Sequence, residues 1–300
     1  MENIWLHRYS VLVAAFTLFL LVAGALVTSN AAGLSVPDWP LSYGKLMPEM
    51  TGGIFYEHGH RMIATTTGVL TIILAVWLWR SEPRRWLRRL GLAALAAVVL
   101  QGLLGGLTVL FLLPKPISIG HACLAQLFFS TTVSIALFTS PSWRRGAQIV
   151  PDAGGPSVRS LALACPFIVL AQLALGAAYR HQALGLVPHV IGAMAVMGFV
   201  LFAGITVLLR YGSHRELRRW AITLILITFL QVFAGVGAYM SRVATETAVQ
   251  PMPVMVWFTV AHVVMGALTL AASVVLAIQV FRNLRRPEPA FESAGVTVTP

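Results

Sequence analysis

The chain has 300 residues, of which 58% are hydrophobic and only 10% are charged, and its formal net charge at pH 7 is +11. This composition excludes an ordinary soluble domain, in which about a quarter of the residues are charged. It also gives no support to a nucleic-acid partner, because the basic residues are dispersed over short segments between apolar runs.

Eight apolar stretches are long enough to span a bilayer, which takes about 20 helical residues. They lie near residues 8–29, 58–80, 88–113, 118–139, 160–179, 187–210, 218–240 and 254–282. The first is too long for a signal peptide and the segment before it too weakly charged, so we expect a retained helix. The sequence therefore predicts an all-α integral membrane protein with eight transmembrane helices.

A short motif recurs in every second predicted helix and indicates an internal repeat. Its members are Leu20 with Gly24, Gln101 with Gly105, Gln172 with Gly176, and Gln231 with Gly235. Small residues let helices approach closely in lipid, whereas a glutamine there needs a partner on another helix or at a cofactor edge. We predict two pseudosymmetric four-helix bundles, residues 1–139 and 160–286, joined by a flexible linker at 140–159 and followed by a disordered tail at 287–300.

The basic residues predict the orientation in the membrane. Of the 21 Lys and Arg residues, 16 fall in one alternating set of loops and termini and five in the other. By the positive-inside rule, both termini are cytoplasmic in a multi-pass protein of a bacterial-type inner (cell) membrane. Cys123 and Cys165 fall inside predicted helices, where we expect apolar fillers and neither a disulfide nor a thiolate metal site.

The remaining predicted helices each carry one histidine toward the end with few basic residues: His60, His121, His189 and His262. The first three fall in the first turn of their predicted helices, and the fourth lies about 12 Å into its helix. Each is followed four residues later by a small residue on the same helix face, which would leave a notch for a flat macrocycle: Ala64, Ala125, Ala193 and Gly266.

Two imidazoles on facing helices of a bundle can bind one haem iron from opposite sides. We predict one haem-iron site per half, with His60 and His121 as ligands in the first and His189 and His262 in the second. Zinc is disfavoured, because no cysteine or paired carboxylate accompanies these imidazoles at a metal-site spacing. For any one of these histidines, the alternative to haem ligation is that the side chain is hydrogen-bonded within the protein or faces water. His58 points about 200° away from His60 around a helix, so we assign it no role.

Only the first half has an acid beside its histidine pair. Glu57 lies one turn before His60, where the second half has Leu186, and Arg61 follows His60. A carboxylate there can move protons during oxidation chemistry. The alternative is a surface ion pair between Glu57 and Arg61 that contributes little energy. We predict that the first half is reactive, with Glu57 beside its two histidines, and that the long outer loop at 30–57 caps it.

The segment from Gly33 to Lys45, which contains Pro-Asp-Trp-Pro, and the run Glu57-His-Gly-His-Arg61 resemble the haem A synthase family. So do the run from Gln101 to Gly106 and the four histidine-bearing helices. The resemblance implies an oxidoreductase that oxidises the C8 methyl of haem O to a formyl, giving haem A for cytochrome oxidase. It places substrate and product between His60 and His121, a haem B cofactor between His189 and His262, and a catalytic acid at Glu57.

The resemblance also implies haem O synthase and an electron acceptor as partners in the lipid bilayer, and it leaves room for a homo-oligomer. Many members have two cysteines in the outer loop, at the positions of Val36 and Ser42 here. Those cysteines cannot be essential to a chemistry that this chain shares.

Two other functions stay open on the residues alone. A b-type cytochrome with two haems that only transfers electrons would share the histidines and the helices. It would not need Glu57 on one side only, nor a long outer loop over one site. A haem carrier or assembly scaffold would need at least one open or weak axial position.

Overall fold

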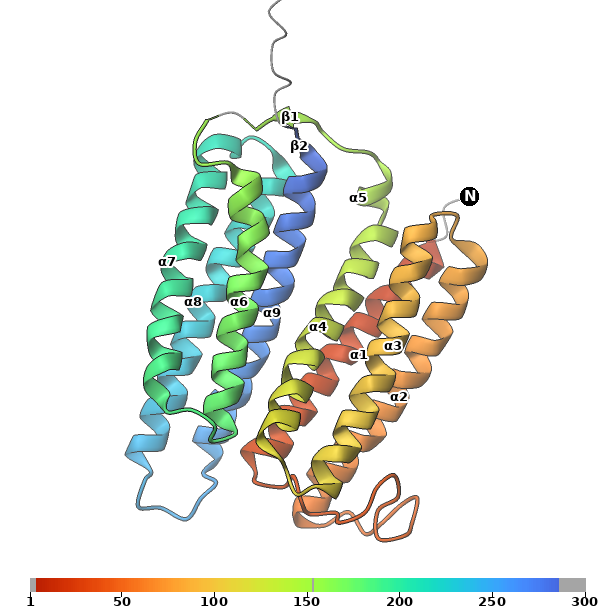
Figure 1. The fold of residues 1–300 in the computed structure, drawn as a ribbon, viewed down its shortest axis with the longest axis vertical. Coiled ribbons are helices and arrows are strands. Elements are labelled where there is room, and N and C mark those ends of the chain that lie inside the picture. Colours follow the sequence, from red (N-terminus) through yellow and green to blue (C-terminus); the bar gives the residue numbers. More distant parts are fainter. Residues whose placement is uncertain (1–3, 153, 286–300) are drawn as a thin grey trace, which may run out of the picture.

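The computed structural model describes residues 4–152 and 154–285. Eight long helices run back and forth through it (Figure 1): α1 Ile4–Ser29, α2 Gly52–Ser81, α3 Arg85–Leu110, α4 Lys115–Thr139, α6 Val158–Arg180, α7 Leu186–Tyr211, α8 Arg215–Ala244 and α9 Pro253–Asn283. Each is long and apolar enough to cross a membrane. The predicted all-α integral membrane fold is therefore confirmed, while the predicted tail at 287–300 lies outside the described residues.

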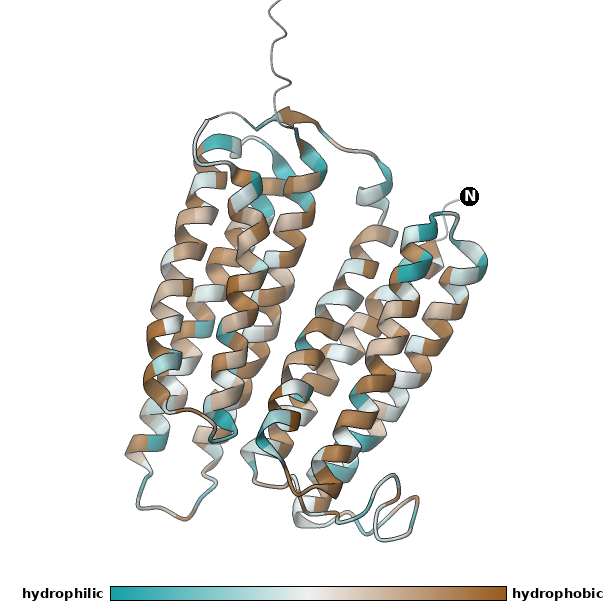
Figure 2. Cartoon of the chain, in the orientation of Figure 1, coloured by the Kyte–Doolittle hydropathy of each residue, from teal (hydrophilic) through white to brown (hydrophobic). Residues whose placement is uncertain are grey.

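The helices form two groups of four, each closed into a ring of neighbours. In the first, α1 contacts α2 and α4, and α3 contacts the same two helices; in the second, α6 and α8 each contact α7 and α9. The groups meet where α9 packs on α1 and α4, and α4 on α6. Figure 2 shows mostly hydrophobic residues along the helices and hydrophilic residues gathered toward their ends. The pseudosymmetry of the two groups stays a prediction.

One end of the molecule carries the start of α1, the α2–α3 and α7–α8 connections, the interbundle linker and the end of α9 (Figure 1). We call this end the arginine-rich end, because these segments hold the 15 basic residues of the larger set that the structure describes. The charge pattern requires that these segments share one side of the membrane, and the fold places them together.

The start of α2 differs from the prediction. The helix begins at Gly52, six residues before the expected start at residue 58, because apolar character marks the part inside lipid and not the whole helix. Gly53 makes the extension fit, since a Cβ there would lie 2.0 Å from Oγ of Ser35 in the outer loop. His60 is therefore eight residues into its helix, roughly 12 Å from the start, and not in the first turn. His121 likewise lies six residues into α4, and His189 three residues into α7.

The described part of the linker is anchored, where a flexible joint was expected. It contains the short helix α5 (Pro141–Arg144) and the strand β1 (Val150–Pro151), which pairs in parallel with β2 (Leu284–Arg285) after α9. Asp152 then accepts hydrogen bonds from the Ser157 hydroxyl at 2.8 Å and from the Val158 N–H at 3.4 Å, at the start of α6. The linker is thus attached to the first helix of the second group, α6, and to the strand that follows its last helix, α9.

Candidate haem-binding site

Each of the four histidines packs against a glycine on the preceding long helix. A Cβ atom added at Gly24, Gly105, Gly176 or Gly235 would lie 3.1, 3.4, 2.9 or 2.8 Å from Cε1 of His60, His121, His189 or His262, respectively. These are the glycines of the recurring motif. The same contact between a motif glycine and a histidine therefore occurs four times. The glycine makes room for an imidazole, a more specific role than the close helix packing expected from the sequence.

The imidazoles of His189 and His262 face each other in the second helix group. Their ring centres lie 6.0 Å apart and the rings are nearly perpendicular, at 88°. An iron atom bound at about 2 Å by an imidazole nitrogen on each side would place two ring centres roughly 6 Å apart. The spacing of this pair therefore fits two axial ligands of one haem iron.

Hydrogen bonds hold both rings of this pair. Nδ1 of His262 lies 2.9 Å from the Gln231 carbonyl, which accepts a hydrogen bond from the Nδ1–H and leaves Nε2 free for a metal. Nε2 of Gln172 lies 3.0 Å from Nδ1 of His189 and donates to the His189 carbonyl at 2.8 Å. The Tyr179 ring stacks parallel to His189 with 6.4 Å between centres. The Gln172 side chain thus contributes to ring orientation across a helix interface, one of the two roles expected for the glutamines, whereas Gln231 contributes through its backbone carbonyl.

The pair in the first helix group has the same surroundings. His60 and His121 lie within electrostatic range of each other, and the carbonyls of Leu20 and Gln101 face their rings as that of Gln231 faces His262. Nδ1 of both histidines is buried without a hydrogen bond of ordinary geometry. Among the described residues, no three or more His, Cys, Asp or Glu side chains cluster as a metal site. Two imidazoles are the number of protein ligands that one haem iron can take.

The small residue one turn after His262 has neighbours from two other helices. A Cβ at Gly266 would lie 2.9 Å from Cδ2 of Leu173 and 3.2 Å from Nε2 of Gln231. Both atoms are the ends of flexible side chains, so the notch expected after each histidine stays a prediction. The glycine that makes room for the His262 imidazole is Gly235, which lies on another helix. Residue spacing within one helix cannot reveal such a contact.

Glu57 is buried and held by two donors. Its Oε1 accepts from Nη2 of Arg61 at 2.7 Å and its Oε2 from the backbone N–H of Val36 at 2.9 Å, and only 4% of the residue is exposed. Nη1 of Arg61 also donates to the carbonyls of Asp38 and Leu41, both at 2.8 Å. Glu57 and Arg61 do form the ion pair that the alternative interpretation supposed. It is not a surface pair, however, because Glu57 is buried and both side chains also bond to the outer loop.

The outer loop closes over the first helix group. The Trp39 ring lies on α3, where a Cβ at Gly106 would be 2.7 Å from Cδ2 of the indole. Asp38 accepts the N–H groups of Gly44 at 2.8 Å and Tyr43 at 2.7 Å in a turn where both residues have positive φ. These hydrogen bonds, that from Gly44 first, hold the pKa of the Asp38 carboxyl below its ordinary value. The Pro-Asp-Trp-Pro segment thus bridges α2 and α3 beside the first histidine pair.

Sequence reasoning missed His58 and Ser42. His58 is buried, its Nδ1 lies 2.8 Å from Oγ of Ser42, and the same hydroxyl accepts from Arg61 at 3.3 Å. The direction of His58, away from His60, was read correctly. It faces the loop because α2 extends outward past the apolar segment. The contact could not be predicted because the sequence did not reveal that α2 begins at Gly52.

The glycine contacts predict a specific loss of haem. Gly235→Ala would place a Cβ 2.8 Å from Cε1 of His262, so the ring must shift, and we expect the purified protein to retain less haem in the second helix group. Gly198→Ala is the matched control, because nothing lies within 4 Å of its added Cβ on α7. The haem-to-protein ratio from optical spectra measures both. Equal ratios in the two variants would contradict the proposed role of the glycine.

Comparisons with known proteins show which sequences this chain resembles. Residues 50–188 match the model of a family described as cytochrome oxidase assembly protein, a segment that contains Glu57, His60 and His121 and ends one residue before His189. The chain is 31% identical over 135 residues to the haem A synthase of Alkalihalophilus pseudofirmus, covering 44% of this chain and 46% of that protein. It is 32% identical over 122 residues to that of Bacillus licheniformis, covering 40% of each. With the haem A synthase of Symbiobacterium thermophilum, the identity is 29% over 233 residues, or 74% of this chain and 73% of the relative. The alignments to the first two span about half of those relatives.

Proposed function

We propose that the chain is a haem A synthase, an oxidoreductase that converts the C8 methyl of haem O to a formyl and so supplies haem A for cytochrome oxidase; its similarity to haem A synthases supports this. One observation carries the proposal most. The family match contains His60, His121 and Glu57, and the outer loop donates a hydrogen bond to Glu57 and packs on Gly106 in the same helix group. An acid, two imidazoles and a cap are the parts that a site for oxidising a bound porphyrin needs.

The two helix groups would hold different haems. His60 and His121 would bind the substrate and later the product, and His189 and His262 would bind haem B. When bound, a haem iron supplies oxidation chemistry that amino-acid side chains lack. The protein's own contribution is to hold each ring against its glycine and to fix the Nδ1 side of His262 on a carbonyl, so that only Nε2 faces the iron.

Glu57 would hold or transfer a proton beside the substrate. Its carboxylate is kept in one place by Arg61 and by the Val36 N–H, and it lies one helical turn from His60. Val36 and Ser42 occupy the positions at which many family members have loop cysteines, so the proposed chemistry would not use a thiol at either position. The Ser42 hydroxyl contacts His58 and Arg61 and so keeps the loop attached to α2.

The haems that the protein carries distinguish the synthase from an electron-transfer cytochrome. A synthase purified from cells that make haem O should contain haem O or haem A together with haem B. A cytochrome that only transfers electrons would contain haem B in both helix groups. Haem B alone, at two per chain, in protein from such cells would contradict the proposed function.

The lipophilic substrate and the eight helices fit delivery within the bilayer, with haem O synthase and an electron acceptor as partners and a homo-oligomer as an arrangement to test. For the orientation, we predict that the arginine-rich end faces the cytoplasm. Reporter fusions after Arg84 and Val150 should report inside, and a fusion after Lys45 should report outside. An outside signal at Val150 would overturn this topology.

A further inference from the structure

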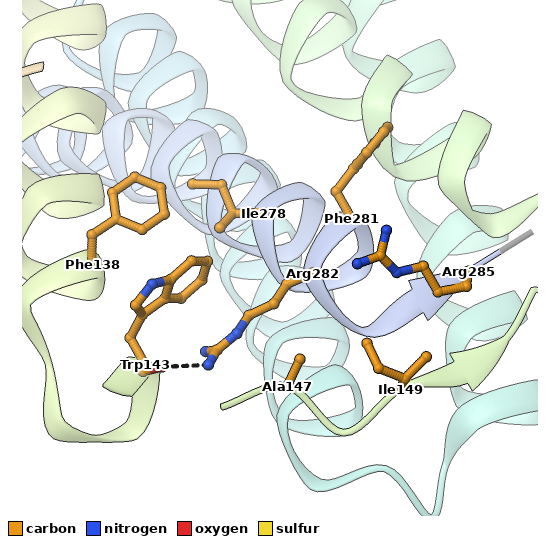
Figure 3. A pocket seen from close by; sticks show the side chains of 8 residues that line it. All are labelled: Phe138, Trp143, Ala147, Ile149, Ile278, Phe281, Arg282 and Arg285. Carbon is orange, nitrogen blue, oxygen red and sulfur yellow. Dashed lines mark hydrogen bonds between the residues drawn. The ribbon is translucent and has the colours of Figure 1, made fainter. Parts of the chain in front are cut away.

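An open pocket of about 480 Å³ lies between the two helix groups at the arginine-rich end. Figure 3 shows the side chains that line it: Phe138, Trp143, Ala147, Ile149, Ile278, Phe281, Arg282 and Arg285. They come from α4, α5, the linker, α9 and β2. The pocket therefore exists only because the helix groups meet, and it lies at the opposite end of the helices from the outer loop. Its volume is within the range of ligand pockets, about 300–1,000 Å³.

The inner part of the pocket is apolar and aromatic. The Phe138 and Trp143 rings contact edge to face with 4.7 Å between centres, and the Ile278 side chain lies beside them. Ile149 is 52% exposed and Phe281 is 39% exposed, so apolar surface remains uncovered where the helices end. Tryptophan at this depth is typical of the membrane–water interface, where an acyl chain meets its head group.

Among the described residues that line the pocket, two are arginines and none is a carboxylate. The Arg282 guanidinium lies 4.0 Å from the centre of the Trp143 ring and donates to the Trp143 carbonyl. Arg285 is exposed at the mouth, and Arg159 stacks behind Phe281 at 4.4 Å from the ring centre. Glu216 lies within electrostatic range of Arg282 but does not line the pocket. An apolar groove below guanidinium groups is complementary to a lipid with an anionic head group.

We propose that this pocket binds an anionic phospholipid, with one acyl chain against Phe138, Trp143 and Ile278 and the phosphate at Arg282 and Arg285. Basic pockets between transmembrane helices bind such head groups. A lipid here would contact both helix groups and the linker, and so stabilise the way in which the groups meet. The proposal does not depend on the haem chemistry of the opposite end.

Native mass spectrometry of the full-length protein tests the proposal, with phosphatidylglycerol and phosphatidylcholine of the same acyl chains as probes. We expect phosphatidylglycerol to be retained more strongly. Arg285→Gln should lower its affinity about fivefold, the effect of one interfacial charge. Ala147→Trp, which fills the pocket and keeps both arginines, should weaken retention too. Arg219→Gln is the matched control, an exposed arginine on α8 that does not line the pocket.

Three results would overturn the proposal. Equal retention of the two lipids would show that the head group is not recognised. An equal loss in Arg219→Gln and Arg285→Gln would show that general surface charge attracts the lipid. Unchanged retention in both Arg285→Gln and Ala147→Trp would place the lipid elsewhere. Circular dichroism of each variant, compared with the unaltered chain, separates loss of binding from loss of fold.

Discussion

Glu57→Gln should lower the conversion of haem O by about 100-fold or more while both haems stay bound, the scale expected for loss of a general acid or base. The haem ligands are untouched, and a glutamine amide oxygen still accepts one of the two hydrogen bonds from Arg61 and the Val36 N–H. The lost property is the ability to ionise. Accumulation of a partly oxidised haem would also fit this role. Haem extraction and chromatography measure the rate, and optical spectra measure the occupancy.

Glu49→Gln is the matched control for this substitution. Glu49 is an exposed residue of the same outer loop, eight positions before Glu57. It should convert haem O at the normal rate. If Glu57→Gln converts haem O as fast as Glu49→Gln does, Glu57 only fastens the loop, and the catalytic group must be another residue of the site.

Removing the second histidine pair should abolish one spectral signature completely. In His189→Ala, in His262→Ala and in the double variant, purified from cells that make haem B but no haem O, we expect loss of the low-spin spectrum of a haem with two imidazole ligands, because the first pair then has no substrate and each ligand of the second pair is essential to that coordination. In His60→Ala and His121→Ala, that spectrum should persist while haem O conversion is lost. His7→Ala is the control, since His7 bonds to the Ala136 carbonyl at the arginine-rich end, away from both pairs. A normal low-spin spectrum in the double variant would show that these residues do not bind haem B.

The sequence predicted all eight helices, because a run of about 20 apolar residues in a membrane protein has few alternatives to a helix. It did not predict where helices continue outside the lipid. The first turns of α2 contain Gly52, Gly53 and Glu57, which read as loop residues. They are helical because Ser35 and Val36 of the outer loop pack on them, and those contacts join residues about 20 positions apart.

The candidate site was predictable in its residue types but not in its contacts. The four histidines and the four glycines of the motif were both recognised, yet their pairing across helices required the packing of α1 with α2 and of α8 with α9. The burial of Glu57 depends on a backbone N–H in the loop, which no side-chain pattern reveals. His58 was set aside because its partner, Ser42, also lies in that loop.

The central claim is that this chain makes haem A, and the most direct measurement is the identity of the haems extracted from membranes of cells that make haem O and express the protein. The account predicts a formyl haem, identified by chromatography and mass spectrometry, in cells with the unaltered chain. In cells with His60→Ala, it predicts that haem O is the only farnesylated haem. Membranes in which the unaltered protein is present and loaded with haem, but in which haem O remains the only farnesylated haem, would contradict it.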